Sequence, residues 1–276
     1  SPFRADVMKA ELLEEIRAFI RQHRQEWQPA TEWRPPLAGI ASAADPWFEK
    51  LKQAVSLTHA RPHDILPSAR SVLAFFIPFE RAVARANRSG QAAAREWALS
   101  YIETNRLVSG LGEHLQRVLG RMGHAAAATP PTHNFDPARL VSDWSHRHVA
   151  FIAGLGRFGL HRMLITAAGC SGRLGSLATS AEIEPDPVAP NEACLYRHDG
   201  SCARCVARCV NGALTRDGFD RHRCYATCLR NASLHQDLGL ADVCGKCLTG
   251  VPCAWRDPVA AMQVHEAPGS PGAAKP

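Results

Sequence analysis

The feature that most constrains this chain of 276 residues is the crowding of its cysteines toward one end. Ten cysteines are present, and nine lie in one segment: Cys194, Cys202, Cys205, Cys209, Cys224, Cys228, Cys244, Cys247 and Cys253. Their spacings include C-x2-C-x3-C from Cys202 and C-x2-C-x5-C from Cys244. Such runs are typical of iron–sulfur ligation, in which each cluster takes four thiolates and adjacent runs share clusters. The segment therefore predicts two 4Fe-4S clusters that use eight of these nine thiols.

Two other uses of cysteine fit this pattern less well. A disulfide framework is typical of short secreted chains, whereas this chain is long and confines its cysteines to one segment. Zinc would need closed sites of four ligands, to which His198, His222 and His235 could contribute. The three-residue spacing before Cys209 and the recurrence of the pattern favour iron–sulfur clusters.

Charge and hydropathy limit the expected partners and location. Two clusters with their thiolates would offset most of the formal charge of +6, so this charge is weak support for nucleic-acid binding. No apolar run reaches about 18 residues, so no transmembrane helix is expected. The N-terminal stretch lacks an apolar signal core and a twin-arginine pair. We therefore expect a cytoplasmic protein with reduced thiols and no membrane partner.

Hydrophobic periodicity marks the first helix clearly. Residues 9–27 are expected to be helical, because Leu12, Ile16 and Ile20 share one face and charged residues occupy the other. Residues 31–70 are rich in proline and are expected to be irregular, apart from a short helix near Trp47–Leu57.

The middle of the chain predicts a layered α+β fold. The apolar run Ser71–Phe79 predicts a buried strand, and the periodicity of residues 92–120 predicts one long helix or two. Further strands are expected at four segments: His124–Ala128, Val149–Ala153, Met163–Thr166 and Leu174–Thr179. A strand–helix–strand order followed by more strands is consistent with one sheet covered by helices.

Proline content and the cysteine segment suggest boundaries along the chain. Residues 184–193 contain three prolines and are expected to form a linker. We expect four parts: an N-terminal helical segment over 1–60, a cofactor-binding domain over 61–188, a two-cluster domain over 189–258 and a flexible tail over 259–276.

Two segments together resemble a known group of proteins. The first is AGLGRFGLHRMLITAAGCSGRLGSLATS, at Ala153–Ser180. The second contains GSCARCVARCVNGAL, FDRHRC and VCGKCLTGVPC. The pairing resembles the epoxyqueuosine reductase-like proteins, which are similar in turn to the reductive dehalogenases, over roughly residues 65–255. The resemblance implies a nitroreductase-like α+β domain that binds cobalamin, followed by a ferredoxin-like domain with two 4Fe-4S clusters.

The resemblance also implies a ligand scheme. The first cluster would take Cys194, Cys202, Cys205 and Cys253, and the second would take Cys209, Cys224, Cys244 and Cys247. Cys170 and Cys228 are then left over, although Cys228 lies one helical turn from Cys224 and could replace it.

The chain departs from the family pattern at several positions. Asp199 stands where the family often has a cysteine, so Cys194 is the substitute. Val210 and Ala254 replace the usual prolines that follow the last cysteine of each run. Family members that reduce epoxyqueuosine also carry a helical-repeat tail that helps to hold transfer RNA. The chain stops soon after its cysteines, so we expect a different substrate and no tRNA partner.

The glycine-rich segment supplies the candidate cofactor-binding residues. GLGRFG matches G-x-G-x-x-G, but no acidic residue follows at the distance a dinucleotide site needs. The resemblance implies instead that glycines let the backbone approach a corrinoid. The glycines concerned are Gly154, Gly156, Gly159, Gly172 and Gly175; the alternative is that they form turns between strands.

Candidate catalytic groups precede this segment. The resemblance implies that Asp143 is the proton donor, and a capping or surface role is the alternative. His146 and His148 are two residues apart, so on a strand they would share a face and could contact the corrinoid, or form a solvated pair. Tyr101, on the predicted long helix, is expected chiefly to pack.

The leading hypothesis is an oxidoreductase in which two 4Fe-4S clusters pass electrons to a bound cobalamin that reduces a small molecule. Its electron donor would be a protein such as a ferredoxin or flavodoxin. One alternative is a ferredoxin-like electron-transfer protein that serves a partner enzyme. Another is a flavin-dependent reductase, because nitroreductase-like domains also hold flavin.

Overall fold

A four-stranded antiparallel sheet lies at the centre of the computed structural model, which describes residues 2–266. Its strands are β1 (Leu37–Ser42), β2 (Ser71–Pro78), β8 (Gly172–Thr179) and β3 (Ala126–Ala128), in that spatial order. The central pair runs in register from Ser71 opposite Thr179 to Pro78 opposite Gly172. The α+β class predicted from the sequence is confirmed.

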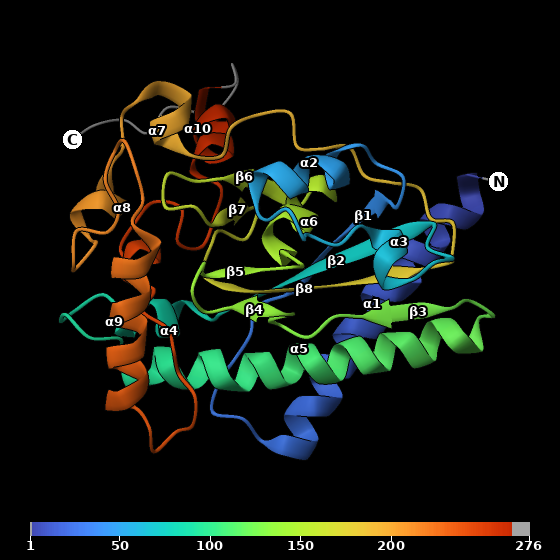
Figure 1. The fold of residues 1–276 in the computed structure, drawn as a ribbon, viewed down its shortest axis with the longest axis horizontal. Helices are drawn as coiled ribbons and strands as arrows, with labels where there is room; N and C mark the ends of the chain where they lie inside the picture. Colours follow the sequence, from blue (N-terminus) through green and yellow to red (C-terminus); the bar gives the residue numbers. More distant parts are fainter. Residues whose placement is uncertain (1, 267–276) are drawn as a thin grey trace, which may run out of the picture.

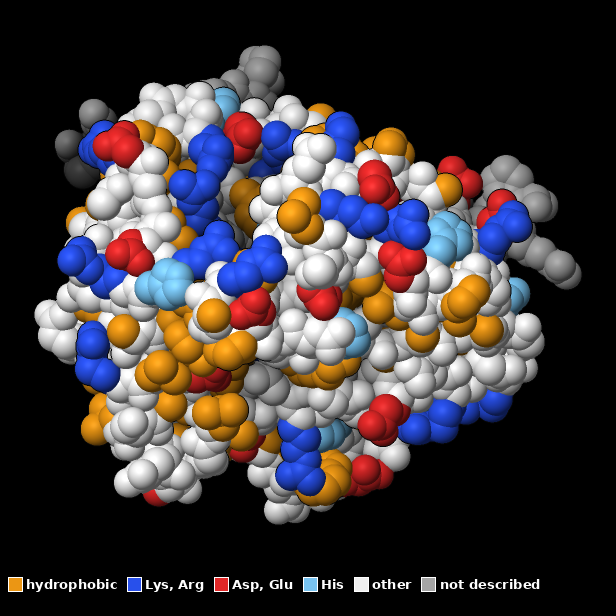
Figure 2. All heavy atoms as spheres, in the orientation of Figure 1, with side chains coloured by type: hydrophobic (Ala, Val, Ile, Leu, Met, Phe, Trp, Pro, Cys, Tyr) orange, Lys and Arg blue, Asp and Glu red, His pale blue; other side chains and the backbone are white. Residues whose placement is uncertain are grey.

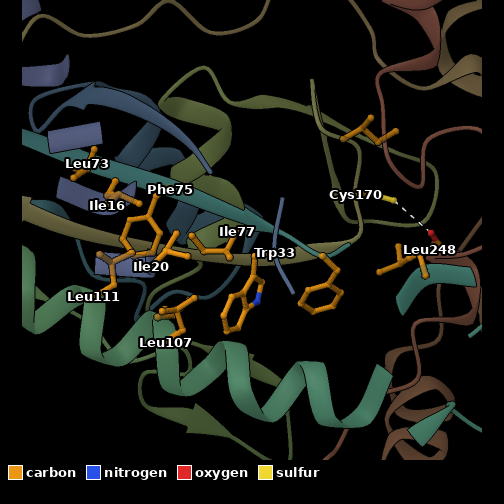
Figure 3. Close-up of a cluster of buried hydrophobic side chains, with 14 of the residues drawn as sticks. Ile16, Ile20, Trp33, Leu73, Phe75, Ile77, Leu107, Leu111, Cys170 and Leu248 are labelled. Carbon is orange, nitrogen blue, oxygen red and sulfur yellow. Dashed lines mark hydrogen bonds between the residues drawn. The ribbon is translucent and has the colours of Figure 1, made fainter. Parts of the chain in front are cut away.

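Strand β2 is buried on both faces because helices cover both faces of the sheet (Figure 1). Leu73, Phe75 and Ile77 point to one side, where they meet α1 (Pro2–Trp27) and α5 (Arg95–Arg121). Figure 3 shows Ile16 and Ile20 of α1, and Leu107 and Leu111 of α5, around Phe75.

The alternating side chains Val72 and Ala74 face the opposite layer, as the two-residue period of a strand requires. There they pack with α2 (Trp47–Ala54) and α6 (His146–Ile152), and Trp144 fills the layer between the helices and the sheet. The sheet is therefore the middle of three layers.

Several expected elements are present, and others differ. The expected helices over 9–27, 92–120 and Trp47–Leu57 correspond to α1, α5 and α2. The structure also contains short elements that the sequence did not indicate: α3 (Pro62–Ile65), α4 (Arg81–Ala86), β4 (Phe135–Asp136), β5 (Val141–Ser142) and β6 (Gly156–Phe158). The segment Met163–Thr166 contains β7 (Leu164–Thr166), which pairs with β6 in a hairpin.

The strand predicted at Val149–Ala153 is wrong, because these residues belong to α6 or cap it. Its apolar run was too short for periodicity to separate a buried strand from a buried helix turn. The prediction that 31–70 is irregular missed β1, whose small residues gave little strand signal but pair with all of β2 except its last two positions.

The cysteine segment folds around short helices. They are α7 (Leu195–Asp199), α8 (Arg204–Ala207), α9 (Arg221–Leu234), the 3-10 turn η1 (Lys246–Leu248) and α10 (Pro258–Glu266). The expected flexible tail begins with α10, and residues 267–276 lie outside the part of the chain that the structure describes.

Hydrogen bonds fasten the cysteine segment to the layered part. The Asn87 side chain donates to the Cys244 carbonyl at 3.0 Å, and the Lys246 ammonium donates to the Asn87 carbonyl at 3.1 Å. The Cys170 amide donates to the Cys253 carbonyl at 3.0 Å. The expected linker is also fastened, because the Asp186 carboxylate accepts from the Ile40 amide at 2.8 Å.

No helix in the described range 2–266 is long and apolar enough to cross a membrane.

Candidate cofactor site

One group of four cysteines lines a small cavity. Cys194 precedes α7, Cys202 and Cys205 lie before and within α8, and Cys253 follows η1. Burial raises the pKa of the Cys205 thiol to about 12, and the neighbouring thiols of Cys253, Cys194 and Cys202 act in the same direction. Metal centres bind cysteine as the thiolate, so four thiols that line one small cavity are a suitable ligand set.

A much larger cavity is lined by the second expected group, Cys209, Cys224, Cys244 and Cys247, and also by Cys170 and Cys228. Burial raises the pKa of Cys247. The charges of four neighbouring thiols raise it further: Cys244, Cys224, Cys205 and Cys209. Because Cys205 belongs to the first group, the two groups lie beside each other. This is the arrangement that the interleaved scheme requires.

Cys224 and Cys228 compete for one place in the second group. They lie one turn apart on α9, and their sulfur atoms share a hydrogen bond that lowers the pKa of Cys224 to about 7 and raises that of Cys228. The hydrogen bond therefore favours the thiolate form of Cys224 and the protonated form of Cys228.

The spare thiol Cys170 lies against the first group. Its sulfur, the sulfur of Cys253 and a ring nitrogen of His161 all lie within 4.8 Å of one another. The His161 Nε2 is 3.4 Å from the Cys253 sulfur, and hydrogen bonds from Cys170 and His161 lower the pKa of Cys253 to about 5. Figure 3 shows the Cys170 thiol directed at the Leu248 carbonyl, 3.9 Å away.

An unpartnered indole supports the presence of a cluster beside the second group. Trp97 is 3% exposed, and in the described part of the chain its Nε1 donor has no hydrogen-bond acceptor. The indole covers Gly245, between Cys244 and Cys247, and lines the same cavity. A buried N–H group without an acceptor costs free energy of folding. The sulfur of an iron–sulfur cluster could accept this hydrogen bond. The donor set therefore fits an iron–sulfur cluster.

The larger cavity has a volume of about 1010 Å³. Its walls combine aromatic side chains of the layered part, such as Phe76 and Trp144, with α9 and the second cysteine group. This volume lies at the upper end of the range of volumes found for small-molecule sites, so it is compatible with a large cofactor. On the face in Figure 2, the surface is hollowed between the α7–α8 region and the β6–β7 hairpin.

His146 and His148 both line this cavity, but on α6 and not on a strand. Burial lowers the pKa of each to about 4, so both rings are neutral near pH 7. His146 bridges the Ser176 hydroxyl at 2.8 Å and the Pro130 carbonyl at 2.9 Å, whereas His148 bonds the Ser145 hydroxyl at 2.7 Å. The expectation that they share one face as a strand pair is therefore wrong.

Of the candidate glycines, only Gly172 lines the cavity. Gly154 packs against the Pro187 carbonyl and Gly156 against the Ile165 carbonyl of its hairpin. Gly159 packs against His161, and Gly175 against the Phe75 ring. At these four positions, other protein atoms occupy the space that a Cβ atom would need.

The Asp143 carboxylate is turned away from the cavity walls. It accepts a hydrogen bond from the Thr58 hydroxyl at 2.6 Å. Its neighbours Ser142 and Trp144 line the cavity, so Asp143 lies at the rim of the site.

The sequence did not point to the charged lining of the cavity. Tyr101 donates its hydroxyl proton to the Asp242 carboxylate at 2.7 Å, and the Arg173 guanidinium lies 4.5 Å from the centre of the Tyr101 ring. Burial raises the pKa of Tyr101 to about 12. Arg147, Arg162 and Arg221 are further lining residues that no motif predicted, because they come from separate parts of the chain.

The structure combines a three-layer α+β body, two groups of cysteines and a large adjoining cavity, an arrangement that fits the binding of a redox cofactor. In fold the chain is similar to solved epoxyqueuosine reductases and reductive dehalogenases, the proteins that the two sequence segments resemble.

Three solved structures illustrate this likeness. An epoxyqueuosine reductase from Bacillus subtilis, described with its aspartate-bearing catalytic loop swung out of the active site, is 18% identical with a TM-score of 0.52. An epoxyqueuosine reductase with a modified tRNA stem loop is 18% identical with a TM-score of 0.53. Both matches cover 90% of this chain. A reductive dehalogenase linked by its description to B12-dependent dehalogenation is 18% identical over 83% of this chain, with a TM-score of 0.54.

The chain spans 64% of the length of each of these two epoxyqueuosine reductases and 31% of the dehalogenase. At such identities the likeness concerns the fold. No protein-family model matches the chain, and no curated protein matches its sequence.

Proposed function

We propose that this protein is a reductase in which two 4Fe-4S clusters deliver electrons to a cobalamin held in the large cavity, where a small molecule is reduced. The observation that carries the proposal is the convergence of two cysteine groups, one of which opens onto that cavity. An electron carrier alone would have no need for a space of about 1010 Å³ beside its inner cluster.

In this proposal each cysteine group holds one cluster. Cys194, Cys202, Cys205 and Cys253 hold the outer cluster, and Cys209, Cys224, Cys244 and Cys247 hold the inner one. Residues 189–258 would then act as the ferredoxin-like part and residues 61–188 as the nitroreductase-like part. The clusters would supply single electrons, and the corrinoid would supply a low-potential metal centre.

The cavity walls give the bound cofactor its surroundings. Gly172, His146 and His148 would line the corrinoid, and the two neutral histidines would add no charge to that wall. The other four candidate glycines would act indirectly: Gly154, Gly156, Gly159 and Gly175. Their close packing would position the β6–β7 hairpin and the sheet around the cavity.

Two groups could donate the proton that a reduction consumes. Asp143 remains the candidate from the sequence, and the Bacillus subtilis enzyme described with its aspartate-bearing catalytic loop swung out of the active site is a precedent for a catalytic aspartate that moves. Tyr101 already lies in the cavity wall, keeps its proton at neutral pH and is held by Asp242. Asp143→Asn and Tyr101→Phe, measured at equal cobalt content, would separate them.

The proposed partners follow from the same site. Electrons would come from a small protein such as a ferredoxin or flavodoxin. One structural neighbour was solved with tRNA and another is linked to dehalogenation, but we propose a free small molecule for this chain.

The test is anaerobic purification with added hydroxocobalamin, followed by iron, sulfide and cobalt analysis of one sample. We expect about eight iron atoms per chain, since each cluster has four, and about one cobalt. Eight iron atoms without cobalt would instead support the electron carrier. A yellow cofactor absorbing near about 450 nm would support the flavin enzyme.

A further inference from the structure

The large cavity carries a strong excess of positive charge. Its lining contains Arg147, Arg162, Arg173, Arg197, Arg221 and Lys246, but Asp242 is its only carboxylate among the described residues. On the face in Figure 2, Lys and Arg side chains gather around the hollow between the α7–α8 region and the β6–β7 hairpin. Like charges that line one cavity repel one another, and the positive potential that they create favours an anion.

These arginines form no ion pair within the described part of the chain, although the charge of Asp242 acts on Arg173 at longer range. No carboxylate in residues 7–263 lies within 4.0 Å of any of the five guanidinium groups. Arg147 donates to the Arg162 carbonyl at 3.0 Å, and Arg173 donates to the Asn105 side-chain oxygen at 2.9 Å. Both acceptors are neutral, so the hydrogen bonds orient the side chains without cancelling their charge.

The proposed clusters do not account for this set. The cations beside the cysteines are Lys246 and Arg208, which feel the charge of Cys244 and Cys247 respectively. Arg147 instead lies near Arg173 and Arg221. Arg147, Arg173 and Arg221 therefore lie together in the cavity wall.

We propose that Arg147, Arg162, Arg173 and Arg221 form an anion-binding subsite that selects a small organic substrate with a carboxylate or phosphate group. This inference rests on the proposed function, because it names the substrate class of the same cavity. A planar guanidinium pairs with either oxoanion through two parallel hydrogen bonds, which fixes orientation as well as charge. The anionic end would be anchored here while the reducible end extends toward the cofactor.

The anionic group bound by the arginines could also come from the corrinoid. Cobalamin carries a phosphodiester in its nucleotide loop, whereas cobinamide lacks it. The experiment must therefore separate an anionic substrate from the cofactor's own phosphate.

The test uses full-length protein loaded with hydroxocobalamin under anaerobic conditions. Benzoate and inorganic phosphate are titrated against sodium chloride at equal ionic strength, and the midpoint of thermal unfolding and the heat of binding are recorded. We compare the wild type with Arg147→Gln and Arg162→Gln. Arg117→Gln is the matched control, because Arg117 is an exposed arginine on α5 far from the cavity lining.

We expect benzoate or phosphate to raise the unfolding midpoint of the wild type and of Arg117→Gln more than chloride does. Removal of one charge-assisted pair should weaken the apparent affinity about tenfold or more in Arg147→Gln and Arg162→Gln. Unchanged iron content in all variants shows that the fold is intact. Equal effects of all three anions, or equal affinities in all variants, would overturn the proposal.

A parallel arm compares hydroxocobalamin with cobinamide. Arg147→Gln could weaken the binding of hydroxocobalamin but leave the binding of cobinamide, benzoate and phosphate unchanged. In that case the arginines hold the cofactor's phosphodiester, and the substrate assignment is wrong. If the protein binds benzoate or phosphate through these arginines but never retains cobalt, the proposed function fails while the anion subsite stands.

Discussion

At the scale of single residues, protonation distinguishes thiols that spacing leaves equivalent. The hydrogen bond between Cys224 and Cys228 favours the thiolate form of Cys224, and Cys170 donates toward Cys253. Both spare thiols therefore lie within reach of a proposed ligand, and each can hold its proton when the neighbouring thiolate binds metal.

The ligand scheme predicts the effect of losing one thiol. Cys205→Ser should reduce iron from about eight to about four atoms per chain, because only the outer cluster loses a ligand. Cys228→Ser is the control and should keep all of its iron. Iron and sulfide analysis of anaerobic samples measures both, and equal loss in the two variants would show that the scheme is wrong.

The unpartnered indole predicts a shift in potential. Trp97→Phe keeps the ring over Gly245 but removes the N–H donor. A hydrogen bond to cluster sulfur favours the reduced state, so its loss should lower the potential of one cluster. A net bond of about 1 kcal/mol corresponds to roughly 40 mV for one electron. Redox titration followed by electron paramagnetic resonance measures the shift, and Trp47→Phe, at an exposed position, should show none.

At the scale of elements, α6 brings two neutral histidines into one cavity wall. His146 remains neutral in the folded protein down to about pH 4, whereas an unfolded histidine gains a proton below about pH 6.5. The unfolded state therefore binds more protons in this window, and stability falls as the pH falls through it.

His146→Asn should reduce this acid sensitivity. We expect a shallower decline of the denaturation midpoint between about pH 6.5 and 4 than in the wild type, where one histidine contributes up to about 1.4 kcal/mol per pH unit. His63→Asn, at an exposed position in α3, should leave the slope unchanged. Denaturant unfolding at steps of pH measures the slopes, and parallel curves for His146→Asn and the wild type would contradict the assignment.

Two glycines in different elements should respond in opposite ways. Gly120→Ala, near the end of α5 with nothing close to its Cβ position, should stabilise the protein by about 0.5–1 kcal/mol. Gly175→Ala, in β8, would meet the Phe75 ring and should cost about 1–3 kcal/mol. Equilibrium denaturation compares them, and a neutral Gly175→Ala would mean that this part of the core can adjust.

The elements also show what could be predicted from the sequence. Long periodic segments such as α1 and α5, and the apolar run of β2, were predicted because each repeats one signal over many residues. The run at Val149 was too short to separate helix from strand. The division of the cysteines into two groups came from the family resemblance. The proposed arginine subsite had no such signal, because Arg147, Arg173 and Arg221 come together only in the tertiary fold.

At the scale of the whole molecule, the cysteine segment depends on its surroundings for stability. Helices as short as α7 and α8 are not stable alone. The hydrogen bonds at Asn87 and Cys170 fasten the segment to the layered part, and the proposed clusters would cross-link it internally.

Removal of iron should therefore loosen the molecule unevenly. After anaerobic chelation we expect amides in 194–253 to exchange faster with solvent, while those of β2 and β8 keep their protection. Hydrogen exchange followed by mass spectrometry of peptides measures both regions. Uniform loss of protection would mean that the sheet itself depends on the clusters.

The meeting of Cys253 with Cys194, Cys202 and Cys205 has a consequence for biosynthesis. On the proposed scheme, the outer cluster needs a ligand that leaves the ribosome only after every other cysteine of the chain. A nascent chain can therefore complete the sheet and form the inner group before the outer group closes. Cofactor insertion would then be a late event in maturation, and a chain truncated just before Cys253 would be left with three ligands in a site built for four.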